Sequence, residues 1–300
     1  MSELPLRAIT DRGLQAAPAT KARGYWATVG RRLSRDKVSM ACALILLLIF
    51  VSALIAPWLH LADPYQGSMI RRLRHIATPG FPLGTDELGR DMLARLVYGG
   101  RLSLIVGISP VVFAFCIGTG LGLVAGYAGG RVNTVIMRTV DVFYAFPSVL
   151  LAVAISGVMG GGMVNGLVAL SLVFIPPLCR VSETATTQLR SLDFVEAARA
   201  SGASGISIIL HHVVRNAAAP VFIYASSLIS VSILLAAGLS FLGLGVVPPT
   251  PDWGQMLSNL RQAIYVQPLI CALPGVAIFV TSLSFNMVSD GLRQAMDVKA

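Results

Sequence analysis

The stretch LSLIVGISPVVFAFCIGTGLGLVAGYAGG, residues 102–130, contains no Asp, Glu, Lys or Arg. A helix needs about 20 apolar residues to cross the hydrocarbon core of a bilayer, so this stretch can span a membrane. The whole chain agrees, because 55% of its 300 residues are apolar and 12% are charged, about half the charged share of a soluble protein. Its mean hydropathy is +0.75. The composition excludes a soluble or disordered chain and predicts an all-α, polytopic membrane protein.

Five long runs without charged residues predict six transmembrane helices. These runs are residues 38–62, 102–130, 142–179, 216–251 and 262–289. The third run is too long for one span, and its glycine-rich segment 157–166 predicts a turn that divides it in two. The end of the fourth run is rich in glycine and proline and predicts a loop. The first run is longer than the apolar core of a signal peptide and follows a long polar tail, so we expect an uncleaved helix.

The distribution of basic residues predicts the orientation of the spans. Residues 1–37 hold eight Lys and Arg, which places the N-terminus inside, and six spans return the C-terminus to the same side. The inner segments then carry 16 basic residues and the outer segments 7. The six arginines of residues 63–101 conflict with this rule, although four acidic residues are interspersed among them.

The predicted organisation has five parts. They are a cytoplasmic tail at 1–37, a first transmembrane helix at 38–62, an extracytoplasmic loop at 63–101, a five-helix core at 102–289 and a cytoplasmic tail at 290–300. Within the loop, residues 84–87 and the nearby arginines allow two interpretations. They form a solvated interface segment, or they contact an external protein.

Four glycines recur every fourth residue in the second span: Gly118, Gly122, Gly126 and Gly130. This spacing puts them near one face of a helix. Small residues on one face let two membrane helices approach closely. The pattern favours tight helix packing, and the alternative is a surface that slides during a conformational change.

The sequence contains no site for chemistry or for an energy source. It has no GxxxxGK[ST] phosphate loop and no GxSxG or HExxH motif. An ion-coupled carrier usually requires ionisable residues in the middle of its spans. Here no span has one, and Asp141 lies near the inner end of the third span. Adjacent His211 and His212 point apart on a helix, so we expect no metal site, and the basic residues form no nucleic-acid-binding stripe. An intramembrane enzyme would need paired polar groups at membrane depth.

The inner loop at residues 181–216 predicts two short helices joined by a glycine turn. Asp193 and Glu196 resemble a capping box at the start of the first helix, and Gly202 and Gly205 bracket the turn. The second helix would place one set of apolar residues on one face. This set is Ile206, Ile209, Leu210, Val213 and Val214. Such an exposed, rigid hairpin is suited to receive force from another protein.

Glu196-Ala-Ala, with glycine six residues after the glutamate and with His and Asn further on, resembles the "EAA" loop of the membrane subunits of ABC importers. Further stretches resemble the peptide/nickel permease branch of this family and its second type of subunit. These stretches are residues 82–91, 129–141, 146–148, 239–245, 248–254 and 290–293. The resemblance extends over about 70% of the chain and implies the type I importer permease fold.

The resemblance implies a role for the loop and a set of partners. The residues that dock on the ATPase would be Glu196, Ala197, Ala198 and Gly202, with His212 and Asn216 in the helix behind them. The chain would be a non-catalytic subunit without a cofactor, forming half of a pathway in a bacterial inner membrane. Its partners would be a second homologous permease in a heterodimer, two cytoplasmic ATP-binding subunits and an extracytoplasmic solute-binding protein.

Three points stay open at this stage. The solute could be a dipeptide, an oligopeptide, a glutathione-like peptide, an opine or a nickel chelate. A self-sufficient secondary carrier or channel is the alternative function, and a cap for its own helix is the alternative role of Glu196. The chain also departs from many relatives, because Arg215 replaces a proline before Asn216, so the second helix of the loop is free to continue without a break.

Overall fold

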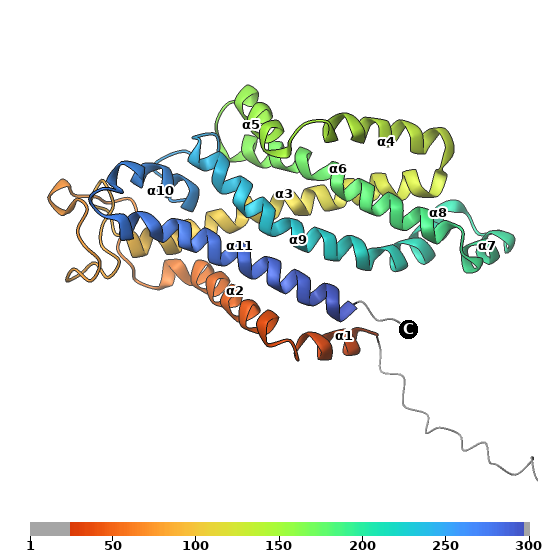
Figure 1. Cartoon of the computed structure of the whole chain (residues 1–300), viewed down its shortest axis with the longest axis horizontal. Coiled ribbons are helices and arrows are strands. Elements are labelled where there is room, and N and C mark those ends of the chain that lie inside the picture. The colour runs from red at the N-terminus through yellow and green to blue at the C-terminus, as the bar shows by residue number, and fades with distance from the viewer. Residues whose placement is uncertain (1–24, 297–300) are drawn as a thin grey trace, which may run out of the picture.

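The computed structural model describes residues 25–296 of the chain, which fold into helices joined by turns and loops (Figure 1). Apart from two isolated β-bridges, these residues contain no β-structure. The prediction of an all-helical protein is therefore confirmed. Residues 1–24 and 297–300, which belong to the two predicted tails, lie outside the described part of the chain.

Eleven α-helices make up the described chain. They are α1 (Tyr25–Leu33), α2 (Lys37–Ile55), α3 (Met92–Ala128), α4 (Gly130–Tyr144), α5 (Ser148–Met159), α6 (Met163–Arg190), α7 (Asp193–Ala200), α8 (Gly205–Ile208), α9 (Val214–Phe241), α10 (Trp253–Leu260) and α11 (Pro268–Met296). Short turns of 3₁₀-helix at Ala56–Trp58, Met69–Arg71 and Arg261–Ala263 and the π-helical turn η3 at Ile209–Val213 complete the secondary structure.

Five helical segments are long and apolar enough to cross a membrane. They are Lys37–Trp58, Met92–Ala128, Met163–Arg190, Gly205–Phe241 and Pro268–Met296. The third of the six predicted spans is not a single helix, because α4 and α5 meet at an angle of 87°. Pro147 lies at this bend, and a proline disfavours helical backbone in the residue before it. The pair counts as a sixth span only if both helices are taken together.

Several helices extend beyond the uncharged runs from which they were predicted. α3 begins at Met92, ten residues before the predicted span, because the Asp91 side chain caps it by accepting hydrogen bonds from the N–H groups of Leu93 and Ala94 at 2.7 and 3.2 Å. α11 continues past residue 289 to Met296. Charged residues end a hydrophobic run but not a helix, because Lys, Arg and Glu are good helix formers.

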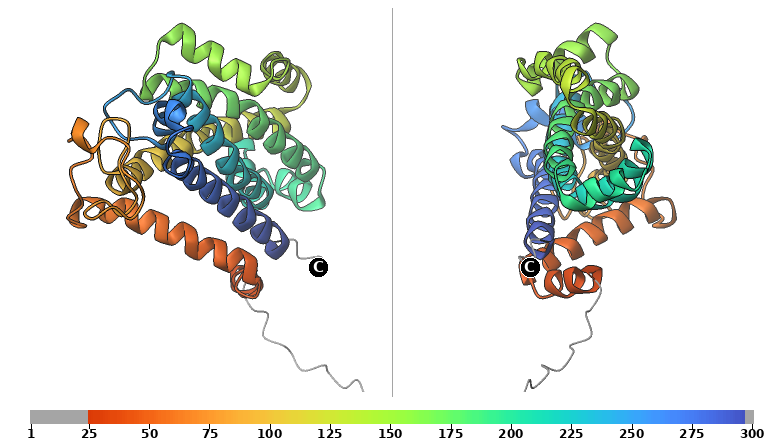
Figure 2. Two further views of the ribbon diagram at one scale, coloured as in Figure 1. Left: turned by 60° about the vertical axis from the view of Figure 1, so that its left-hand side comes forward. Right: turned by 90° about the vertical axis from the view of Figure 1, so that its right-hand side faces the viewer.

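The long helices run lengthwise beside one another, and α3, α6 and α9 enclose the main hydrophobic core (Figure 1). The loop between α2 and α3 and the short α10 lie at one end of the bundle, and α7 and α8 lie at the other. α4 and α5 cover one flank, and α1 and α2 lie on the opposite flank against α11 (Figure 2). The two ends of the bundle therefore carry different structures.

Three of the four spaced glycines lie where α3 packs against α6. A Cβ added to Gly118 would lie 2.8 Å from the carbonyl oxygen of Ile175, and one added to Gly122 would lie 2.4 Å from that of Cys179. Gly126 is as tight, with the carbonyl oxygen of Glu183 at 2.7 Å from such an atom. No larger residue fits at these positions, so the backbones of the two helices touch.

Gly130 does not take part in this contact. α3 ends at Ala128, and Gly130 is the first residue of α4, with φ +49° and no atom within 4 Å of an added Cβ. The spacing of four residues continues from Gly126 to Gly130 in the sequence, but the helix ends between these two residues. The face predicted from four glycines consists of three.

Candidate functional site

The predicted inner hairpin exists and stands at one end of the bundle. α7 and α8 are joined by residues 201–204, and α8 continues through η3 into α9. Figure 1 shows this hairpin at the end opposite to the long loop between α2 and α3. The second helix of the hairpin runs on into a long apolar helix, as expected from Arg215 in place of proline.

Gly202 makes the turn between α7 and α8. Its φ is +80°, and its N–H donates to the carbonyl oxygen of Arg199 at 3.0 Å, while the N–H of Ala203 donates to that of Ala198 at 3.1 Å. These two bonds form a Schellman motif with glycine at the left-handed position. No atom lies within 4 Å of an added Cβ at Gly202, so glycine is required here by the backbone conformation and not by space.

Glu196 is exposed on α7, and its carboxylate has no hydrogen bond or ion pair within residues 25–296. The predicted capping box is wrong, because the N-cap residue is Leu192 and Asp193 is already the first helical residue. Glu196 therefore does not cap its own helix. Its charge lies in the first turn of α7, where the helix dipole favours a negative group, and its oxygens remain available to another molecule.

The base of the hairpin is fixed to the helix bundle. Val195, Ile208 and Val213 are fully or almost fully buried and pack with Leu123 and Tyr127 at the end of α3. Close packing of this kind transmits displacement, because interiors are dense and hardly compressible. Movement of the hairpin would therefore reach α3 as well as α9.

The predicted apolar face of the second helix is only partly correct. Ile206 and Leu210 are exposed, at 73% and 57%, whereas Ile208 and Val213 are buried. The π-helical turn η3 inserts an extra residue into the helix and so rotates the positions that follow it. A pattern with a period of 3.6 residues does not anticipate such a turn.

The hairpin that carries Glu196 also exposes apolar side chains on both of its helices. Leu192 and Phe194 on the α7 side are 44% and 39% exposed, and Ile206 and Leu210 lie on the α8 side. Apolar side chains that gather on an exposed surface typically mark a contact with another protein. The hairpin thus combines a free carboxylate with apolar side chains.

The structure brings the predicted docking residues together at this end of the bundle. Glu196, Ala197 and Gly202 are exposed, and Ala198 is partly buried beneath α7. The ring of His212 packs behind α7 with its centre 6.4 Å from that of Phe194. Asn216 lies one turn further on, and its amide donates to the carbonyl oxygen of His212 at 2.7 Å.

The opposite end of the bundle contains a buried polar cluster that the sequence did not predict. Asp86 accepts from Arg90 Nε at 2.6 Å and lies 3.3 Å from Arg95 Nε, and all three side chains are at most 6% exposed. Glu87 pairs with Arg90 at 2.9 Å, and burial together with the charge of Asp86 raises the pKa of its carboxyl. The segment 84–87 is therefore largely buried. Thr85 and Asp86 are 0% and 2% exposed, so both interpretations, a solvated segment and a contact with an external protein, are wrong for these two residues.

Asp252 ties α10 to α3 near the same end. Its carboxylate caps α10 by accepting from the N–H groups of Gly254 and Gln255, and it accepts from the hydroxyl of Ser103 at 2.6 Å. Burial raises the pKa of this carboxyl. The indole of Trp253 packs on Gly100, where an added Cβ would lie 2.7 Å from the ring. These contacts explain the polar and aromatic residues of the stretch 248–254.

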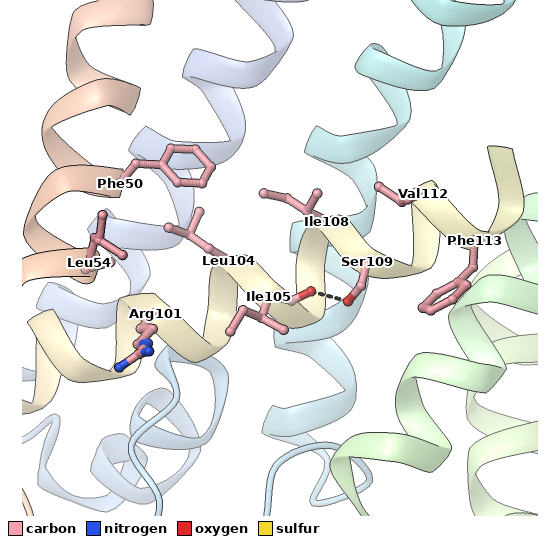
Figure 3. A pocket seen from close by; sticks show the side chains of 10 residues that line it. Phe50, Leu54, Arg101, Leu104, Ile105, Ile108, Ser109, Val112 and Phe113 are labelled. Atoms are coloured by element: carbon pink, nitrogen blue, oxygen red, sulfur yellow. Dashed lines mark hydrogen bonds between the residues drawn. The ribbon is translucent and has the colours of Figure 1, made fainter. Parts of the chain in front are cut away.

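A large apolar groove of ≈ 550 Å³ lies between α2 and α3, with Phe50 and Leu54 on one side, Ile105 and Ile108 on the other, and Arg101 near one end (Figure 3). Within the described residues, no three His, Cys, Asp or Glu side chains gather into a potential metal site.

Comparison with known proteins decides the family. Residues 118–299 match the family described as "Binding-protein-dependent transport system inner membrane component". The chain belongs to this family. Residues 24–74 of the permease also match the "N-terminal TM domain of oligopeptide transport permease C". The resemblance seen in the loop and in the flanking stretches is thereby confirmed.

Individual relatives agree with this assignment. The permease is 40% identical to the glutathione transport system permease protein GsiD of Pectobacterium atrosepticum over 277 residues, which cover 92% of each chain. It is also 40% identical to the di/tripeptide transport system permease protein DppC of Pseudomonas aeruginosa, over 89% of each chain. The dipeptide transport system permease protein DppC of Alkalihalophilus pseudofirmus is 39% identical over 91% of the permease and 90% of the relative.

The fold resembles that of a solved ABC importer. An inward-facing structure of the MetNI methionine ABC transporter superposes with a TM-score of 0.56 and 19% sequence identity, over 68% of the permease and 97% of that chain. The permease is therefore a multi-pass membrane subunit of an ABC importer with the type I permease fold. The comparisons give no support to a self-sufficient carrier or channel.

Proposed function

We propose that the permease forms half of a translocation pathway for peptides or a related small solute and receives the work of ATP hydrolysis through the α7–α8 hairpin. Glu196, Ala197, Ala198 and Gly202 would contact a cytoplasmic ATPase, and His212 and Asn216 would support them from behind. The observation that carries this proposal is the exposed Glu196, which has no partner among the described residues, on a hairpin that is continuous with α9. The names of the relatives, which transport glutathione, dipeptides and tripeptides, support the class of solute.

The hairpin supplies a way to couple an external nucleotide to the pathway. The permease has no phosphate loop of its own, so ATP would bind and be hydrolysed on two partner subunits. Closure of those subunits would displace the hairpin, and the displacement would pass through Val195 and Val213 to the ends of α3 and α9. A second homologous permease would supply the other half of the pathway, and the two halves would change between inward-facing and outward-facing states.

The proposed orientation places the hairpin and both termini in the cytoplasm of a bacterial cell and the loop between α2 and α3 outside, where a solute-binding protein would dock. The buried cluster supports this orientation. Arg90 and Arg95 belong to the outer arginines that conflict with the basic-residue rule, and both are buried and paired with Asp86. Because these two arginines are paired inside the protein, they count less toward the conflict with the basic-residue rule.

Accessibility labelling tests the orientation with two isoleucines, both strongly exposed. In a variant without native cysteines, Ile70→Cys lies in the long loop, where Ile70 is 89% exposed, and Ile206→Cys lies in the hairpin, where Ile206 is 73% exposed. We expect a membrane-impermeant maleimide to label Ile70→Cys in intact cells and Ile206→Cys only after permeabilisation. Labelling of Ile206→Cys in intact cells would reverse the orientation and remove the hairpin from any cytoplasmic ATPase.

Replacement of both Glu196 and Gly202 by alanine tests the coupling. The first change removes the free carboxylate, and the second forces a Cβ into left-handed backbone at a cost of about 1–2 kcal/mol. We expect the solute-stimulated ATPase activity of the assembled transporter to fall at least tenfold, to its unstimulated rate, while the permease stays inserted. Gly120→Ala is the matched control, because Gly120 has no positive φ and no atom within 4 Å of an added Cβ. Full stimulation in the double variant would exclude the hairpin as the coupling element.

A further inference from the structure

Two charged side chains far apart in the sequence meet on the flank of the bundle. Arg180 of α6 forms an ion pair with Asp141 of α4 through Nη2 and Oδ1. The guanidinium carbon of Arg180 also lies 5.0 Å from the centre of the Tyr144 ring. Both charged side chains belong to segments that are long and apolar enough to cross a membrane. For Arg180 this segment is α6, and for Asp141 it is α4 taken together with α5. Charged groups in such segments typically line a watery pathway, because hydrocarbon does not solvate them.

Two cavities adjoin this pair. The first has a volume of ≈ 260 Å³ and an aromatic and apolar lining, which includes Phe143, Tyr144, Phe146, Pro176, Leu228 and Val231. The second has a volume of ≈ 280 Å³ and a more polar lining, which includes Arg180, Thr184, Gln188 and Pro220. Tyr144 lines the first cavity and Arg180 the second, so their cation–π contact joins the linings of the two cavities.

The order of the lining residues shows that the two cavities follow one another along the seam between α6 and α9. On α6, Pro176 lines the first cavity and Gln188, further along the helix, lines the second. On α9, Val231 lines the first cavity and Pro220, nearer the start of the helix, lines the second. α6 ends, and α9 begins, beside the α7–α8 hairpin. The second cavity therefore lies nearer to the hairpin on both helices.

We propose that these cavities are successive parts of the solute path along this subunit, and that Arg180 and Asp141 form its contact for a zwitterionic solute. Arg180 receives the carboxylate of the solute, and Asp141 receives its ammonium group. This inference rests on the proposed function and adds the residues and the charge pattern that the path selects. A peptide with free termini carries both charges.

The chemistry of the pair suits a contact that opens during transport. The two side chains are 48% and 44% exposed, and an ion pair with this much exposure contributes little to stability. A zwitterion can insert its two ends and exchange one ion pair for two, so no charge is left unpaired at any stage. The planar guanidinium holds a carboxylate through two parallel hydrogen bonds, which a lysine does not do.

A second polar contact joins the same two helices and supplies a matched control. The amide of Asn133 in α4 donates to Glu183 Oε1 in α6 at 2.6 Å and to the carbonyl oxygen of Ala125 at 3.3 Å. Neither Asn133 nor Glu183 lines either cavity. This contact fastens α4 to α6 without a side chain that lines either cavity, whereas the Arg180–Asp141 pair includes Arg180, which lines the second cavity.

The test is ATP-driven uptake of radiolabelled dialanine and glutathione into proteoliposomes that contain the permease with its companion subunits and binding protein. We expect Arg180→Gln and Asp141→Asn each to lower uptake at least tenfold. Asn133→Ala should lower uptake less than threefold. Arg180→Lys, which keeps the charge, should retain at least a third of wild-type uptake, and Asp141→Asn alone tests the loss of charge if Arg180→Gln does not assemble. Equal losses in Arg180→Lys and Arg180→Gln would overturn the proposal.

The exchanged pair Arg180→Asp/Asp141→Arg separates solute contact from a structural role. It restores the attraction between α4 and α6 but places each charge on the wrong side of the path, so we expect uptake to stay at least fivefold low in an assembled complex. Full recovery of uptake would make the pair a structural tie and overturn the proposal. If the wild-type complex takes up neither peptide with ATP, the proposed function itself fails. If it does and the charge variants match it, only the present inference fails.

Discussion

The Gly122→Leu variant is expected to lose the packed bundle. An added Cβ at Gly122 already lies 2.4 Å from the carbonyl oxygen of Cys179 and 2.8 Å from the backbone nitrogen of Glu183. These are backbone atoms, so no side-chain rotation relieves the overlap, and the rest of the leucine side chain forces α3 away from α6. Overpacking of a core typically costs about 1–3 kcal/mol of stability. Because this variant pushes two helix backbones apart along their length, we expect a loss at or above the upper end of that range.

The measurement is the melting temperature and the monodisperse fraction of the permease purified in detergent. The matched control is Gly120→Leu, two residues away on the same helix, where no atom lies within 4 Å of an added Cβ. We expect Gly120→Leu to melt close to the wild type and Gly122→Leu to aggregate or to melt far below it. Equal melting temperatures for the two variants would mean that α3 and α6 do not pack through the glycine face.

Replacement of Asp86 by alanine should be comparably severe at the other end of the bundle. Asp86 is the shared partner of Arg90, at 2.6 Å, and Arg95, at 3.3 Å, and the side chain of Arg95 is 1% exposed. Without the carboxylate, the hydrogen-bond partners left to Arg95 within the described part of the chain are the carbonyl oxygens of Pro64 at 2.9 Å and Pro249 at 3.5 Å. Loss of one partner from a buried ion pair typically destabilises a protein by about 3–5 kcal/mol.

Thermal unfolding of the purified permease measures this effect as well. Asp63→Ala is the control, since Asp63 is an exposed aspartate of the same loop and its side chain accepts a hydrogen bond from the N–H of nearby Tyr65 at 2.8 Å. We expect little change in that variant and a large fall in the melting temperature of Asp86→Ala. A wild-type melting curve for Asp86→Ala would show that the buried cluster does not hold the loop to α3.

The sequence predicted the helical hairpin well because its signals are local. Glycine at position 202 allows the left-handed conformation that ends α7, and the absence of proline at position 215 allows the second helix to continue. The predicted capping box was wrong because the helix begins at Asp193, with Leu192 as its N-cap, and the local sequence hardly distinguishes this start from one a residue later. The predicted apolar face was partly wrong because η3 adds a residue to a turn, and Ile208 and Val213 are the residues that pack inward.

The long loop shows the opposite case. Six arginines within residues 63–101 resemble a solvated, charged segment when only the sequence is read. The structure pairs two of them with Asp86 and buries all three side chains. Burial of charge depends on partners and on covering residues such as Pro64 and Pro249, and no local pattern specifies those.

By itself, the sequence determined that this chain is a helical membrane protein with an exposed hairpin, because hydrophobic length and turn residues act locally. It also carried the stretches by which the family is identified. Only the tertiary structure decided that Gly118, Gly122 and Gly126 touch the backbone of α6 and that Arg180 meets Asp141. Each of these depends on the approach of helices that are distant in the chain, and the free energy of such contacts is set by geometry that no single segment contains.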